Sequence, residues 1–132
     1  MGKFDNKNIS IYGLGNIGYN IGKKLIEKNN NINVQGFDIT KEKSTIANES
    51  NAITKEMKSY IDSIEDCDIL IISTPTSSTY EIFESLSGII SNKTIIFDIC
   101  SSKRAISEWS YDLLPDNEII GLCPFINHDS IL

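Results

Sequence analysis

The chain has 132 residues, a formal net charge of −6 at pH 7 and 40% hydrophobic residues. This length suits one ordinary globular domain with a hydrophobic core, and the composition excludes a disordered chain. Because the charge balance is acidic and no basic stripe is present, the sequence argues against a nucleic-acid-binding protein.

The three cysteines stand at unrelated spacings, without the paired C-x-x-C pattern of a zinc site. An odd number of cysteines suits a reducing compartment better than a disulfide framework. Residues 1–8 are polar, and the longest apolar run, Ile69 to Ile72, is too short to span a membrane. We therefore expect a cytoplasmic protein with no membrane contact and no bound metal.

The stretch from Ile9 to Gly18 predicts a buried strand, a glycine turn and the start of a helix. Its three glycines have the G-x-G-x-x-G spacing of a dinucleotide-binding βαβ unit. The first permits the turn, the second lets the pyrophosphate approach the backbone, and the third lets the helix pack closely. Free N–H groups at the helix start would face the diphosphate. The residues predicted to bind the cofactor here are Gly13, Leu14, Gly15, Asn16, Ile17 and Gly18.

A second strand, Ile32 to Asp38, ends in a carboxylate where this fingerprint requires one. Asp38 would accept hydrogen bonds from the adenosine ribose hydroxyls and would repel a 2′-phosphate. We therefore predict NAD as the cofactor in preference to NADP. The alternative interpretation is a glycine-rich strand–helix turn followed by a solvated aspartate, with no ligand.

Helices and strands alternate along the rest of the chain. In chain order, the expected elements are a polar helix (Lys41–Ala47), a brief strand (Ala52–Ile53), a helical turn (Lys55–Ile61) and a buried strand (Ile69–Ile72). They are followed by a helix (Ser77–Leu86), a second buried strand (Thr94–Ile99), a helix that ends near Leu113 (104–113) and a last strand (Glu118–Leu122). This alternation predicts a single domain, residues 1–132, with a Rossmann-type doubly wound α/β fold, a mainly parallel sheet and helices on both faces. Right-handed crossovers bring the carboxyl ends of the strands to one edge, so Ser73, Thr74 and Pro75 are predicted to join the cofactor site.

Four stretches resemble the prephenate and arogenate dehydrogenases of tyrosine biosynthesis. They are the glycine loop, the strand that ends at Thr74 and Pro75, the segment from Asp98 to Lys103, which is similar to the family's D-x-G-S-x-K, and residues 123–130. The resemblance implies hydride transfer from a cyclohexadienyl substrate to NAD with loss of carbon dioxide. It also implies that Ser101 hydrogen-bonds the reacting end of the substrate or cofactor.

The chain departs from the family pattern where the family has its catalytic histidine. Cys123 stands at that position, and Cys100 replaces the glycine of D-x-G-S-x-K. A thiol near its ordinary pKa is mostly protonated at neutral pH and is a poor general base. The only histidine, His128, lies five residues later. The candidate catalytic residues are therefore Ser101, Cys123 and His128.

Members of the family continue into a helical domain that forms the dimer and binds the substrate's carboxylates. We expect this chain to be the nucleotide-binding domain without that part. It would be weakly active or inactive alone and would bind a dinucleotide and a small carboxylate substrate as a homo-oligomer or with a separate substrate-binding chain. Apolar surface on the late helix, at Trp109, Leu113 and Leu114, is expected to be exposed and to drive self-association.

Two other functions stay open. The first is a related oxidoreductase, of the 3-hydroxyacid dehydrogenase or imine reductase type, which shares the glycine motif and the proline after the buried strand. The second is a non-catalytic dinucleotide-sensing module, which the replacement at Cys123 favours.

Overall fold

The computed structural model describes residues 2–99 and 103–122. Within these residues, six parallel strands form one sheet in the order β3-β2-β1-β4-β5-β6. The strands are β1 (Asn8–Tyr12), β2 (Asn33–Phe37), β3 (Lys55–Glu56), β4 (Ile69–Ile72), β5 (Ile95–Asp98) and β6 (Ile119–Gly121). The helices are α1 (Asn16–Lys28), α2 (Lys41–Glu49), α3 (Thr76–Leu86) and α4 (Lys103–Leu113), with a 3₁₀ turn, η1, at Ile64–Asp66. The predicted doubly wound α/β fold is confirmed.

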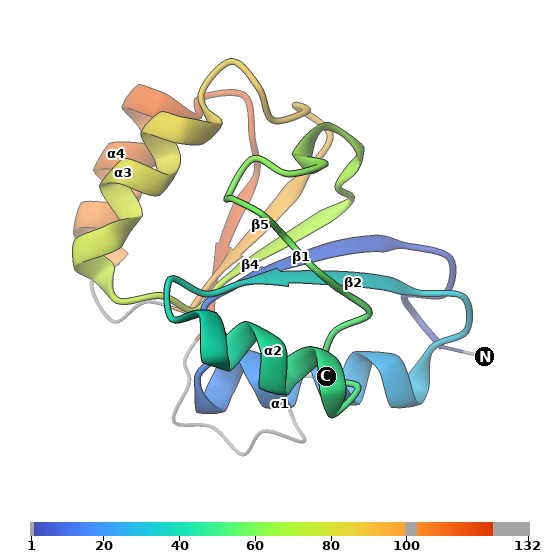
Figure 1. The fold of residues 1–132 in the computed structure, drawn as a ribbon. Coiled ribbons are helices and arrows are strands. Elements are labelled where there is room, and N and C mark those ends of the chain that lie inside the picture. The colour runs from blue at the N-terminus through green and yellow to red at the C-terminus, as the bar shows by residue number, and fades with distance from the viewer. Residues whose placement is uncertain (1, 100–102, 123–132) are drawn as a thin grey trace.

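The sheet lies between two helical layers, α1 with α2 on one face and α3 with α4 on the other (Figure 1). Alternation along the strands supplies a hydrophobic core to each layer. On β1, Ile9 and Ile11 join the core under α1 and α2, whereas Tyr12 joins the core under α3 and α4. All four residues of β4 are buried, as expected for a central parallel strand covered on both faces.

The prediction for residues 52–61 was wrong. Ala52 and Ile53 are buried in the core but are not a strand, and residues 57–63 are not helical. The amides of Ala52 and Ile53 both donate to the carbonyl of Ala47, which holds this stretch against the end of α2. The edge strand that pairs with β2 therefore begins after Ile53, and Lys55 pairs with Gln35.

The apolar surface expected on the late helix is largely covered. Leu114 is 3% exposed, and Trp109 and Leu113 are half-buried against the same core. The ring of Trp109 makes an edge contact with Tyr80 of α3 at 5.6 Å between centroids, so the two helices cover each other's apolar stripes. In the described ranges no helix has the length and apolar character needed to cross a membrane.

The burial difference between neighbouring leucines gives a first prediction. Leu114→Ala should lower the free energy of unfolding by about 2–5 kcal/mol, because it opens a cavity under α4. Leu113→Ala is the matched control and should cost clearly less, since its side chain is only half-buried. Urea denaturation of both variants measures the difference, and equal losses would contradict the described packing.

Candidate functional site

The glycine turn between β1 and α1 is held from three sides. Gly13 has φ +86°, a left-handed conformation that favours glycine, and its N–H donates to the carbonyl of Phe37 at 2.8 Å. The hydroxyl of Ser73, at the end of β4, donates to the Gly13 carbonyl at 2.7 Å. A Cβ on Gly18 would overlap the same Gly13 carbonyl oxygen. Strand β4, strand β2 and helix α1 therefore all meet at this turn.

Gly15 stands in a different environment. Its φ is −72°, which any residue can adopt, and a Cβ built on it would meet no atom within 4 Å. Nothing in the packing of the described residues therefore requires glycine at this position. A Cβ would instead project into the open space in front of the helix, where a bound group needs access to the backbone.

The first turn of helix α1 contains no acidic side chain that could balance the positive end of the helix dipole. The N-cap of this helix is Gly15, and no side chain in the described part of the chain caps it. The first N–H groups of a helix have no intrahelical acceptor and carry the positive end of the helix dipole. A helix start of this kind suits a phosphate group.

Asp38 follows β2 and ties this strand to the glycine turn. One carboxylate oxygen accepts the N–H of Leu14 at 2.8 Å, and the other accepts the N–H of Thr40 at 2.8 Å. Each oxygen keeps a further acceptor position, because a carboxylate offers about four. The bond to Leu14 was not predictable from the motif, since it depends on how β1 and β2 are paired.

The remaining predicted cofactor residues differ in what they present. The Leu14 side chain is 3% exposed, so this residue offers only its backbone. The Ser73 hydroxyl is engaged with the glycine turn. Pro75 precedes α3, whose first turn also lacks an acidic residue and a side-chain cap among the described residues. Thr74 lies half-buried between them.

One residue that sequence reasoning missed is Ile39. Its side chain is 87% exposed directly after Asp38. An isoleucine so exposed at the carboxyl edge of the sheet offers apolar surface next to a carboxylate. The available signal was an aliphatic residue immediately after the acidic end of β2.

The candidate catalytic residues Ser101, Cys123 and His128 lie outside the described residues, as does Cys100. Their roles therefore stay predictions. Of the segment around them, Asp98 is buried at the end of β5, and α4 begins at Lys103. The described part of the chain holds no group of three or more histidine, cysteine or acidic side chains that could bind a metal ion.

Comparison with known families gives a match to "Prephenate dehydrogenase, nucleotide-binding domain" over residues 21–128. The matched region begins after the glycine turn. The family assignment therefore does not depend on the G-x-G-x-x-G motif, and the two observations support each other independently.

Solved structures with the same fold include a prephenate dehydrogenase and an arogenate dehydrogenase. A prephenate dehydrogenase from Aquifex aeolicus, solved with hydroxyphenyl propionate and NAD⁺, is 25% identical, with a TM-score of 0.76 over 90% of this chain and 42% of its own. The Synechocystis arogenate dehydrogenase is 23% identical, with a TM-score of 0.71 over 80% of this chain and 37% of its own. The chain thus spans about two fifths of the length of these enzymes.

A third structure shows how widely the fold is shared. The 3-hydroxyisobutyrate dehydrogenase from Mycobacterium tuberculosis is 18% identical, with a TM-score of 0.72 over 87% of this chain and 38% of its own. At this identity, as for the Synechocystis enzyme, the likeness shows a common fold alone.

The two glycines in front of α1 give a second prediction. Gly18→Ala should lower the free energy of unfolding by about 1–3 kcal/mol, because its Cβ overlaps the Gly13 carbonyl. Gly15→Ala is the matched control, with the same added methyl group in open space, and should stay within about 0.5 kcal/mol of the unsubstituted chain. Denaturant titration of both variants is the measurement, and a large loss at Gly15 would contradict the described turn.

Proposed function

The chain belongs to the prephenate dehydrogenase family as its nucleotide-binding domain, and from this premise we propose that it binds NAD at the carboxyl edge of the sheet. The observation that carries the proposal is Gly15. The packing of residues 2–99 and 103–122 makes no demand for glycine there, yet a side chain at this position would fill the space in front of a helix start that none of their side chains caps. A dinucleotide's pyrophosphate has the charge and the need for close backbone approach that this position accommodates.

The adenosine half of NAD would lie at the end of β2. Asp38 would accept hydrogen bonds from the ribose hydroxyls with the acceptor positions that Leu14 and Thr40 leave open. Ile39 would contact the adenine ring with its exposed side chain. Because the Asp38 carboxylate would repel a 2′-phosphate, we propose NAD in preference to NADP.

For the whole protein, we propose the reaction of the family: oxidation of a cyclohexadienyl substrate of the prephenate or arogenate type with loss of carbon dioxide. When bound, NAD supplies the hydride acceptor. Ser101 would hydrogen-bond the reacting end of the site. His128 would take the substrate's hydroxyl proton, because the thiol of Cys123, at the family's histidine position, is a poor general base. These assignments follow the family motif, and we place the protein in tyrosine biosynthesis on the same basis. We propose the cytoplasm as its location because three cysteines without framework spacing suit a reducing compartment.

Binding calorimetry tests the cofactor proposal. The purified chain should bind NAD, and Gly15→Ala should weaken the binding about tenfold or more, equivalent to about 1.4 kcal/mol, without loss of stability. Because we expect Gly15→Ala to keep the fold intact, a lower affinity at unchanged stability would report on the ligand alone. A folded chain that binds neither NAD nor NADP would overturn the proposal.

Asp38 gives a separate prediction on selectivity. Asp38→Asn removes the negative charge but keeps one carbonyl oxygen as an acceptor, so it should shift the ratio of NADP to NAD dissociation constants about tenfold toward NADP. Glu42→Gln, on the solvent side of α2 near the same strand end, removes one negative charge without touching the glycine turn and is the control. An unchanged ratio in Asp38→Asn would place the ribose elsewhere.

A turnover assay tests the proposed reaction. NADH formation is followed with prephenate and, separately, with arogenate, and with a 3-hydroxyacid as the alternative substrate class. Oxidation of a cyclohexadienyl substrate supports the proposal. Turnover of only the 3-hydroxyacid would assign the protein to the related oxidoreductases.

A further inference from the structure

The chain passes from β3 to β4 across the sheet face that α3 and α4 also cover. Residues 58–63, here called the crossover segment, form turns, and they lie over β1 and β2 (Figure 1). Met57 before the segment and Ile64 after it are both buried in the core of that face. The crossover segment is therefore fixed at both ends, and what it contacts in between determines where its side chains lie.

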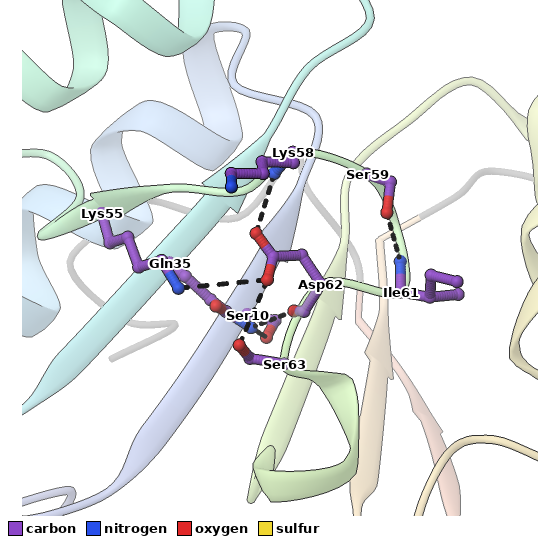
Figure 2. Close-up of polar contacts among 8 residues, drawn as sticks. All are labelled: Ser10, Gln35, Lys55, Lys58, Ser59, Ile61, Asp62 and Ser63. Atoms are coloured by element: carbon purple, nitrogen blue, oxygen red, sulfur yellow. Dashed lines mark hydrogen bonds and ion pairs between the residues drawn. The ribbon is translucent and has the colours of Figure 1, made fainter.

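The first contact is polar and lies across the middle of the two strands. Ser10 of β1 is paired in register with Gln35 of β2. The Gln35 amide donates to the Ser10 hydroxyl at 2.7 Å and to the main-chain carbonyl of Asp62 at 3.0 Å (Figure 2). This cross-strand pair thus holds the crossover segment by its backbone.

Asp62 also organises the turn itself. Its carboxylate accepts the N–H of Lys58 at 2.9 Å and the hydroxyl of Ser63 at 3.2 Å, and the Lys55 ammonium lies 3.9 Å away (Figure 2). The hydrogen bond from the Lys58 backbone is the main reason why the pKa of Asp62 lies below its usual range. The turn is therefore closed by an ionised carboxylate at neutral pH.

The second contact is aromatic and lies two residues further along the same strands. Tyr12 of β1 and Phe37 of β2 are paired in register. The ring of Tyr60 makes edge contacts with both, at 4.7 Å between centroids in each case. The hydroxyl of the fully buried Tyr12 donates to the carbonyl of Tyr60. Tyr60 is thus held by both strands at once.

The two residues whose rings contact Tyr60, Tyr12 and Phe37, each immediately precede a residue of the proposed cofactor site. Tyr12 is followed by Gly13, and Phe37 is followed by Asp38, and the Gly13 N–H donates to the Phe37 carbonyl at 2.8 Å. Edge contacts between aromatic rings are directional, so they constrain both strand ends more than an aliphatic contact of equal area would. A displacement of the Tyr60 ring would therefore reach the glycine turn and the carboxylate together.

We propose that Tyr60 is a positioning residue of the dinucleotide site, whose ring holds Tyr12 and Phe37, and through them Gly13 and Asp38, at the spacing that the adenosine half of NAD requires. This inference rests on the proposed NAD binding. The ring carries the effect, because the ring makes both contacts and the carbonyl that Tyr12 binds belongs to the backbone. Phenylalanine at position 60 keeps all three interactions.

The Tyr60 hydroxyl adds no charge to the site. Burial, and then the negative charges of Asp38 and Glu81, raise the pKa of this hydroxyl above its ordinary value. It therefore stays protonated at neutral pH.

Calorimetry with fragments of the cofactor tests this role at a temperature where each variant is folded by circular dichroism. Tyr60→Leu should weaken NAD, ADP-ribose and AMP by the same factor, about tenfold, because all three share the adenosine half. Tyr60→Phe should restore affinity to within about twofold, since both ring contacts remain. Tyr111→Leu, at a position 80% exposed on α4, is the control and should change nothing.

Two results would overturn the inference: folded Tyr60→Leu with unchanged affinity for AMP, or Tyr60→Phe as weak as Tyr60→Leu. If Tyr60→Leu does not fold, Phe37→Leu replaces it, because it removes one of the two ring contacts of Tyr60 and keeps the Tyr12 hydroxyl that binds the Tyr60 carbonyl. It should weaken AMP and NAD alike by about threefold, and an unchanged affinity would equally overturn the inference. A wild-type chain that binds no NAD would instead fail the proposed function, so the two failures are distinguishable.

Discussion

The close approach of α1 to the glycine turn is the constraint on which the rest of the site depends. The carbonyl of Gly13 lies against the backbone of Gly18 and accepts the hydroxyl of Ser73, so no side chain fits between helix and turn. This contact aims the start of α1 along the carboxyl edge of the sheet. It also joins β1, β4 and α1 into one unit, so the direction of the helix N–H groups is set by backbone packing rather than by flexible side chains.

The three glycines of the motif at this edge meet different structural requirements. Gly13 needs its left-handed backbone and Gly18 needs the absence of a Cβ, whereas a Cβ at Gly15 would meet no atom of the described residues within 4 Å. Stability and ligand access are therefore distributed over different positions of one motif. The effects on stability and on ligand binding can therefore be measured separately, by adding one methyl group at Gly18 or at Gly15.

The crossover segment contacts the strands at this edge although it lies far from them in the sequence. Two cross-strand pairs, one polar and one aromatic, hold it over β1 and β2. Turns replace a covering helix at this point. The ring of Tyr60 supports the strand ends that precede Gly13 and Asp38, and the turn at Asp62 is held over the middle of the same strands. The proposed adenosine side of the site thus draws on three non-adjacent segments.

The sequence by itself determined the doubly wound fold, because hydrophobic periodicity and the glycine spacing are local properties, and it located the edge that carries Gly13 and Asp38. It did not determine which residues after α2 form the edge strand β3. This strand is only two residues long, and its position is set by pairing with β2. Nor could the sequence show that Leu114 is buried or that Tyr60 lies on two strand ends. Such contacts join residues far apart in the chain, and only tertiary packing decides which of them form.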